Sequence, residues 1–154
     1  MVEEQQFTTF YLDGLYFGIG VLKVQEVIKY QPTTRVPLAP TVVRGLINLR
    51  GQIVTAIDLR RRLGLSDRPD DELPMNVVVR TDDGVVSLLV DEIGDVIEAS
   101  DATFEAPPAN LTGPAREHIR GVYKLRDRLL LVLDAEKVVS IGDDLEQMKS
   151  TAQA

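Results

Sequence analysis

The sequence predicts a mostly β protein made of two copies of one small unit. The first observation is an internal repeat: residues 43–63, V-R-G-L-I-N-L-R-G-Q-I-V-T-A-I-D-L-R-R-R-L, are matched without a gap by residues 119–139, I-R-G-V-Y-K-L-R-D-R-L-L-L-V-L-D-A-E-K-V-V. The second is the abundance of Val and Ile, whose branching at Cβ favours strands over helices. The third is that Asp-Gly turns and prolines divide the chain into short segments.

The composition fits one packed unit with an aliphatic core. The 154 residues, 44% of them hydrophobic, are enough to bury roughly two-thirds of the unfolded surface, and Trp is absent. A net charge of -7 repels phosphate groups, so we expect neither nucleic acid nor a membrane surface as partner. Cysteine is absent, and the longest apolar run, residues 15–22, is too short to span a bilayer. These features predict a cytoplasmic protein.

The first unit begins with a hairpin. Residues 6–12 alternate between apolar and polar side chains, Asp13-Gly14 favours a tight turn, and residues 15–20 form the returning strand. Residues 21–30 fit a short turn followed by a strand. Three prolines then make residues 31–40 extended or turn backbone.

The repeated segment 43–63 completes the first unit. It is predicted to form two strands around Gly51. A helical turn should follow, with Asp58 capping its first backbone donors and with Leu59 and Leu63 on one face.

The second unit follows the same plan after a polar, proline-bearing stretch. Residues 75–80 and 85–90 are predicted strands, and three prolines again predict an irregular crossing segment before the repeated hairpin. About five short strands in each unit favour two small closed barrels with a groove between them, because closure removes exposed edges. The predicted division is subdomain one at 6–65, a linker at 66–74, subdomain two at 75–141 and a polar tail at 142–154, with chain crossings between the lobes allowed.

The sequence gives little support for catalysis. It has no cysteine nucleophile, no G-x-S-x-G elbow and no phosphate-binding P-loop. The single histidine, His118, lies in a polar stretch that is more typical of a surface or capping residue than of a catalytic base. We therefore predict no enzymatic activity.

Two clusters of like charge invite a binding interpretation. Asp91, Glu92, Asp95 and Glu98 could gather a hard cation such as Mg²⁺, but the segment lacks the glycine turn of a calcium loop, so a solvated acidic face is favoured. The basic run 60–62 is interpreted as the outer face of one helical turn, or as a patch for an acidic partner.

A more specific feature is a pair of opposite charges in apolar surroundings. Glu26 lies in V-Q-E-V and Arg50 in N-L-R-G, and an arginine fork can make two parallel hydrogen bonds to a carboxylate. Such a pair could orient a binding surface. It could equally be a structural brace, because Asp95 and Arg126 occupy the equivalent places in the second copy.

The sequence resembles the CheW family, the coupling proteins of bacterial chemotaxis, from Phe7 to Ile141. The motifs that carry the resemblance are F-G-I-G-V-L-K-V-Q-E-V-I, T-R-V-P, V-R-G-L-I-N-L-R-G-Q-I-V-T-A-I-D-L-R, V-D-E-I-G-D-V-I and G-V-Y-K-L-R-D-R-L-L-L-V-L-D-A-E-K-V. One position departs from the family pattern: Thr55 stands where members usually carry proline, and threonine suits a strand.

The resemblance implies two Src-homology-3-like β-barrel subdomains, no cofactor, and a scaffold that joins the histidine kinase CheA to the cytoplasmic tips of methyl-accepting receptors. A helical receptor tip would dock in the groove between the barrels, as helices do in other apolar grooves. The residues implicated by position are Val24, Glu26, Gly45, Arg50 and Met75.

The resemblance also implies contacts with the kinase. Its regulatory domain shares the double-barrel fold, and head-to-tail contacts between barrel ends can close into rings or extend arrays. An alternative with the same fold is an adaptor for a kinase that controls pili, development or second messengers. A metal-binding barrel that uses the acidic cluster is the remaining alternative.

Overall fold

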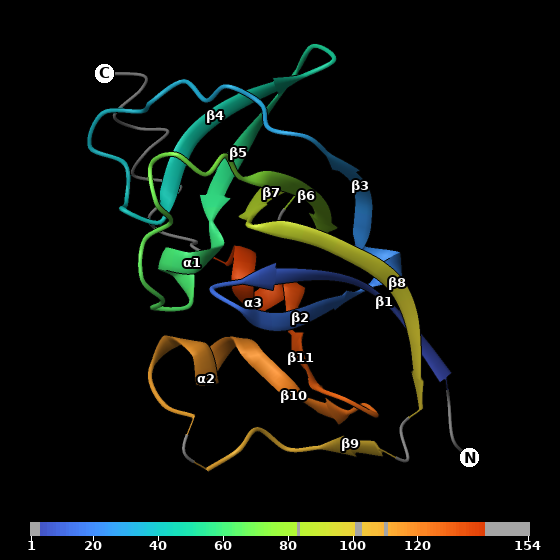
Figure 1. Cartoon of the computed structure of the whole chain (residues 1–154). Coiled ribbons are helices and arrows are strands. Elements are labelled where there is room, and N and C mark those ends of the chain that lie inside the picture. Colours follow the sequence, from blue (N-terminus) through green and yellow to red (C-terminus); the bar gives the residue numbers. More distant parts are fainter. Residues whose placement is uncertain (1–3, 83, 101–102, 110, 141–154) are drawn as a thin grey trace.

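The computed structural model describes residues 4–82, 84–100, 103–109 and 111–140 (Figure 1). Within them the chain is mostly β, as predicted, and the tail predicted at 142–154 lies outside the described residues. The strands are β1 (Glu4–Leu12), β2 (Leu15–Gly20), β3 (Val24–Ile28), β4 (Val43–Leu49), β5 (Gln52–Asp58), β6 (Met75–Thr81), β7 (Gly84–Val90), β8 (Glu92–Ser100), β9 (Phe104–Glu105), β10 (Ile119–Lys124) and β11 (Leu129–Leu133). The helical turns are η1 (Val21–Lys23), α1 (Leu59–Arg62), α2 (Pro114–His118) and α3 (Ala135–Val139).

The first hairpin has the turn that its sequence predicts. Asp13 and Gly14 have φ of 50° and 79°, which are the positive angles of a two-residue turn that matches strand twist. Leu12 pairs with Leu15 directly across it. The alternation of side chains then places Phe10 and Phe17 in the core, both at most 1% exposed.

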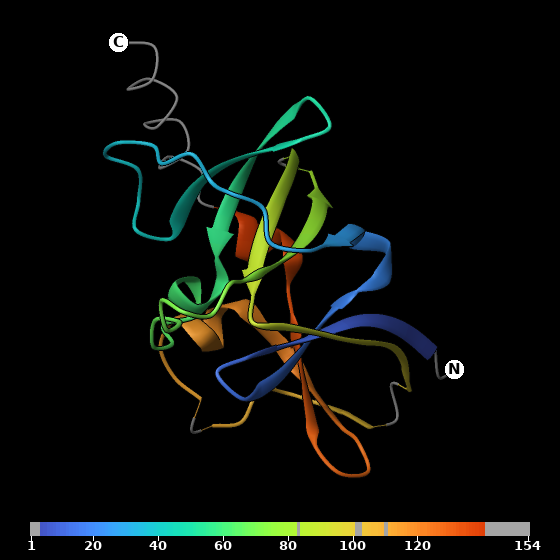
Figure 2. The same cartoon turned by 45° about the horizontal axis from the view of Figure 1, so that its top comes forward.

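The strands form two sheets that exchange hairpins. One sheet has the order β8-β1-β2-β11-β10-β9, and the other has the order β3-β6-β7-β5-β4 (Figures 1 and 2). The exchanged hairpins are joined to the rest of each sheet by parallel strand pairs, β2 with β11 in the first sheet and β5 with β7 in the second. Each sheet therefore combines one hairpin from one copy of the unit with strands from the other copy. The predicted ranges 6–65 and 75–141 therefore each contribute strands to both sheets.

One main core lies between the two sheets. Its buried residues include Phe10 and Phe17 from the first sheet, Val77 and Leu88 from the second, and Leu59 from α1. Two smaller clusters lie apart from it. Because hydrophobic burial is the main stabilising contribution in folding, a core shared by both sheets fixes their relative position.

The repeat is visible in the backbone. In β4 the pairing with β5 slips by one residue at Arg44, and in β10 the pairing with β11 slips at Arg120. Both are β-bulges, in which one extra residue bends the strand. The glycines that follow, Gly45 and Gly121, each lie against backbone that a Cβ atom would meet.

The helical turns after the two hairpins are also equivalent. The Asp58 side chain accepts a hydrogen bond from Arg60 N, and Asp134 accepts one from Lys137 N, so both aspartates cap their helix as expected of this residue type. Leu59 and Leu63 are at most 2% exposed, which confirms the predicted apolar face of α1.

The connection before the second hairpin differs from the prediction. We expected an irregular crossing, but it contains the short strand β9 and the helix α2, which begins at Pro114 where proline fits the first helical turn. His118 ends this helix and is 7% exposed, with Nδ1 2.5 Å from Pro114 O. It is therefore buried rather than on the surface.

Candidate functional site

Glu26 in β3, an edge strand of the five-stranded sheet, lies beside Arg50 in the β4–β5 turn. Arg50 Nη1 donates to Glu26 Oε2 and Arg50 Nη2 to Glu26 Oε1, both at 2.9 Å. The Arg50 side chain is 79% exposed, whereas that of Glu26 is 19% exposed. This end-on pair fixes the direction of the guanidinium while leaving most of it open to a partner.

The turn between β4 and β5 determines where Arg50 points. Arg50 and Gly51 have φ of 53° and 89°, the two positive angles of a tight hairpin turn. Asn48 Oδ1 accepts a hydrogen bond from Gly51 N at 2.8 Å and closes the turn. Arg50 is not a glycine, so this backbone is strained, and such strain is often found at functional sites.

The ion pair changes the acidity of Glu26. Hydrogen bonding to Arg50 holds the pKa of Glu26 below its usual value, because it favours the charged form. Gln25 also donates to Glu26 Oε2 and accepts from Arg80 Nη2 at 2.8 Å. The pair is therefore the centre of a short chain of polar contacts along β3 and β6.

The other residues that the family resemblance suggests for receptor binding are less exposed than Arg50. Val24 and Met75 are partly buried and pack against the main core. Gly45 is buried, with φ of 156°, and a Cβ atom there would lie 2.5 Å from Thr34 O. Leu46 and Thr34 exchange two backbone hydrogen bonds at this place, so Gly45 lets the loop before β4 approach the strand.

The equivalent charges in the second copy are not paired. Within the described residues, Asp95 and Arg126 form no ion pair with each other, and both are exposed. The reason lies in the turn: Asp127 stands where the first copy has Gly51, and neither Arg126 nor Asp127 adopts a positive φ. The expectation that the repeat carries the ion pair over is therefore wrong.

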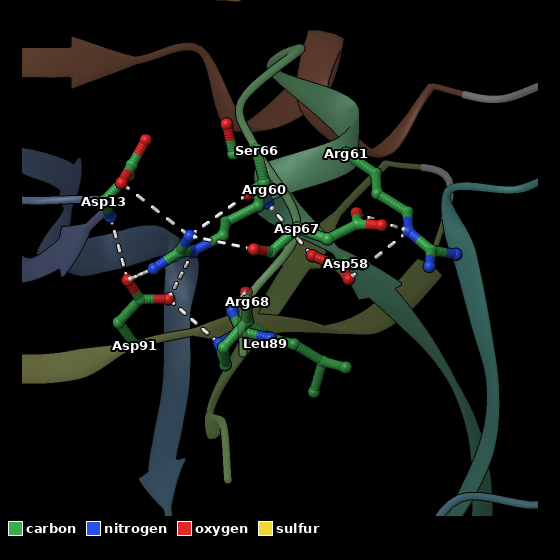
Figure 3. A network of polar contacts seen from close by, with 9 residues as sticks. All are labelled: Asp13, Asp58, Arg60, Arg61, Ser66, Asp67, Arg68, Leu89 and Asp91. Carbon is green, nitrogen blue, oxygen red and sulfur yellow. Dashed lines mark hydrogen bonds and ion pairs between the residues drawn. The ribbon is translucent and has the colours of Figure 1, made fainter. Parts of the chain in front are cut away.

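A second cluster of charges, around Arg60, was not predicted (Figure 3). Arg60 Nε donates to Asp91 Oδ1 at 2.9 Å and Arg60 Nη2 to Asp91 Oδ2 at 2.5 Å. Arg68 Nε donates to the same carboxylate at 2.9 Å, as does Asp13 N at 2.8 Å. The side chains of Arg60, Arg68 and Asp91 are at most 13% exposed. The cluster joins α1, the following loop, the β1–β2 turn and the end of β7.

The arginines of α1 therefore do not form an outer face. Arg60 also donates to Ser66 O, while Arg61 donates to Asp67 Oδ1 and Thr41 O, both at 3.0 Å. Arg62 donates to the last carbonyls of α3, including Val138 O at 3.0 Å. The interpretation of 60–62 as the outer face of one helical turn is wrong, because Arg60 is buried and each guanidinium binds a different segment of the chain. The alternative, a patch for an acidic partner, stays a prediction. The sequence signal for the burial of this helical turn is the apolar pair Leu59 and Leu63, which anchors the turn in the core.

The acidic cluster does not assemble a metal site. Asp91 is held by two guanidinium groups, and Gln6 donates to Glu98 at 3.2 Å. No group of three or more potential ligands lies close together in the described part of the chain. Burial would raise the pKa of Asp91, but hydrogen bonds from Arg60, Asp13 and Arg68 outweigh it and hold the pKa below its usual value.

The fold and these contacts define a class of protein. Two β sheets share one core, and the guanidinium of Arg50 is exposed but held in one orientation, which favours a small binding module. None of the helices among the described residues is long and apolar enough to cross a membrane.

Comparisons with known proteins identify the family. The family model described as CheW-like domain matches residues 6–142, so the chain belongs to the CheW-like family. Curated relatives include the chemotaxis protein CheW of Treponema pallidum, 33% identical over 90% of this chain and 84% of its own length. CheW of Klebsiella aerogenes is 34% identical over 88% of this chain and 82% of its own length.

A solved structure agrees with this assignment. The scaffolding protein TtCheW from Thermoanaerobacter tengcongensis has a TM-score of 0.80 and 26% identity, and the match covers 91% of this chain and 95% of that one. The likeness is consistent with the pair of Src-homology-3-like units that the resemblance implied. The protein is a chemotaxis scaffold of a non-catalytic family, which confirms the predicted class.

Proposed function

We propose that the protein is a cytoplasmic adaptor that couples methyl-accepting chemotaxis receptors to the histidine kinase CheA. The observation that supports this most is the match of residues 6–142 to chemotaxis scaffolds, with more than four-fifths of the first two relatives covered. The protein would be recruited to membrane-bound receptor arrays through these partners.

Receptor binding is proposed to use the surface around Glu26 and Arg50. The Arg50 guanidinium is exposed but already oriented by two hydrogen bonds, so a partner binding there would pay little entropy to order it. A helical receptor tip would place an acceptor against Arg50. Val24 and Met75 support this surface from the core, and Gly45 supports it by letting residue Thr34 pair with β4.

Kinase binding is proposed to use the ends of the β units. The regulatory domain of the kinase would contact this protein head to tail, and such heterologous contacts extend into rings or arrays. The duplicated units, 6–65 and 75–141 with the linker 66–74, would supply one contact surface each.

The test is a binding assay with purified CheA and a receptor tip fragment. Arg50→Ala should weaken receptor binding by about tenfold, because hydrogen bonds to charged groups are worth about 1.5–3 kcal/mol. Kinase binding should change much less. The matched control is Arg126→Ala, which removes the same charge from the unpaired equivalent turn and should leave receptor binding unchanged.

Three results would contradict the proposal. Failure of the wild-type protein to bind either CheA or the receptor tip would exclude the adaptor function. Equal losses in Arg50→Ala and Arg126→Ala would exclude the surface. Binding to a kinase of a pili, development or second-messenger pathway in preference to CheA would favour the alternative adaptor, and thermal unfolding of each variant distinguishes these results from loss of the fold.

A further inference from the structure

The loop between β3 and β4 contains a leucine in an unusual backbone conformation. Ala39 N donates to Val36 O at 3.3 Å, and Leu38 has φ of 62°, so Val36 to Ala39 form a turn with proline at its second position. The third position of such a turn needs a positive φ and usually holds glycine or asparagine. A leucine there is strained, because its Cβ atom lies too close to the following carbonyl oxygen.

This strain is not offset by packing. The Leu38 side chain is 91% exposed, while its neighbours Val36 and Ala39 pack against the main core. The two inward residues anchor the turn and hold Leu38 in solvent, on a loop that runs out beside β4 (Figure 2). A strained residue without an internal contact indicates a role outside the chain.

A basic hollow lies next to this leucine. It has a volume of about 840 Å³ and is lined by the loop, by the start of β4 and by α1. Arg35, Arg44 and Arg61 contribute to its wall. Arg61 is bound to Asp67 and Thr41, but within the described residues the side chains of Arg35 and Arg44 have no hydrogen bond or ion pair. Two unpaired guanidinium groups are notable in a chain with a net charge of -7.

We propose that this hollow is a docking site for an acidic segment of a partner protein. Carboxylates of the segment would pair with Arg35 and Arg44, and an apolar side chain beside them would cover Leu38. Charge complementarity carries the assignment, because a positive patch on an acidic protein selects acidic partners and repels basic ones. The site goes beyond the proposed receptor surface, since neither Glu26 nor Arg50 lines the hollow.

The first experiment measures binding of two peptides to the full chain. The probe is a fluorescent peptide of repeated Glu-Glu-Leu units, and the matched peptide has Lys-Lys-Leu units. The acidic peptide should bind. In NMR spectra of the protein, the chemical-shift changes on binding should be confined to the loop, the start of β4 and α1. Absence of binding, or equal binding of both peptides, would overturn the proposal.

The second experiment separates a docking role of Leu38 from a structural one. Leu38→Asn replaces leucine with a residue that tolerates positive φ, so the melting temperature should stay constant or rise while peptide binding weakens by about fivefold. Leu22→Asn is the matched control, because Leu22 is 96% exposed elsewhere on the chain and has no positive φ. A fall in melting temperature for Leu38→Asn with unchanged binding would show a structural role only.

The repeat supplies a matched control for substitution of Arg44. Arg44→Ala should weaken binding of the acidic peptide by about fivefold, the upper range for an exposed ion pair. Arg120→Ala removes the same charge from the equivalent bulge and should have no effect. Equal effects would show non-specific attraction. If the peptide binds only after deletion of residues 142–154, the chain's own tail is the occupant and the proposed partner site is wrong.

Discussion

The two copies of the repeated hairpin share a backbone and differ in the contacts of their side chains. Asp58 N donates to Val42 O at 2.7 Å in the first copy, and Asp134 N donates to His118 O at 2.9 Å in the second. The bulge and the capped helical turn recur as well. The comparison shows that the duplicated sequence pattern keeps the backbone hydrogen bonds of the hairpin. The side-chain contacts with the rest of the chain differ between the two copies.

The helical turns illustrate this difference. Arg60 in α1 and Glu136 in α3 are equivalent by position in the repeat. Arg60 is buried against Asp91, whereas Glu136 is partly exposed and pairs with Lys23 at 2.9 Å. A buried ion pair is far more sensitive to loss of one partner than an exposed pair.

The largest expected effect comes from breaking the buried cluster. Asp91→Asn leaves Arg60 and Arg68 without their carboxylate, so the free energy of unfolding should fall by about 3 kcal/mol. Glu136→Gln, the change at the equivalent turn, should cost less than about 1 kcal/mol. Urea unfolding of both variants at neutral pH measures the two values, and similar losses would contradict the comparison.

The same cluster predicts a pH dependence. The pKa of Asp91 is lowered in the folded state, so its contribution to stability is complete above the usual carboxyl pKa and is lost as the pH falls through the folded value. The difference in stability between the wild type and Asp91→Asn should therefore be constant near neutrality and shrink below about pH 4. Urea unfolding at decreasing pH tests this, and a constant difference would exclude the lowered pKa.

A smaller effect is expected at the two bulge glycines. Gly45→Ala places a Cβ atom 2.5 Å from Thr34 O, at a φ of 156° that alanine rarely adopts, and should cost about 2 kcal/mol or more. At Gly121 the Cβ would meet Phe104 and Glu105 O, at an ordinary φ. Gly121→Ala should therefore destabilise less than Gly45→Ala in thermal unfolding, and the reverse order would show that φ strain is unimportant.

Exchanging the turn residues should change stability less than the substitutions at the bulge glycines. Gly51→Asp gives the first hairpin the turn residue of the second, and should reorient Arg50 away from Glu26 at a cost of about 1 kcal/mol. The pKa of Glu26 should then rise toward its usual value, which NMR titration of the carboxyl group measures. Asp127→Gly is the control, and an unchanged Glu26 pKa in Gly51→Asp would show that the turn does not direct Arg50.

The sequence determined the local features of this protein. The positive φ of Asp13-Gly14, the capping by Asp58 and the apolar face of Leu59 and Leu63 follow from residue types over a few positions. The meeting of Glu26 with Arg50 could also be anticipated, because a fork and a carboxylate in apolar surroundings favour pairing. These are short-range effects or specific chemical pairings.

Only the tertiary structure decided which segments lie together. Strand alternation is the same whether a hairpin pairs within its own unit or with the other, so the exchange of hairpins between the sheets has no sequence signature. Likewise, the sequence shows that Arg60 is charged but does not show whether its side chain lies on the surface or in a buried cluster. Asp13, Asp91 and the loop after α1 bury it, and they meet there because the two sheets close on one core.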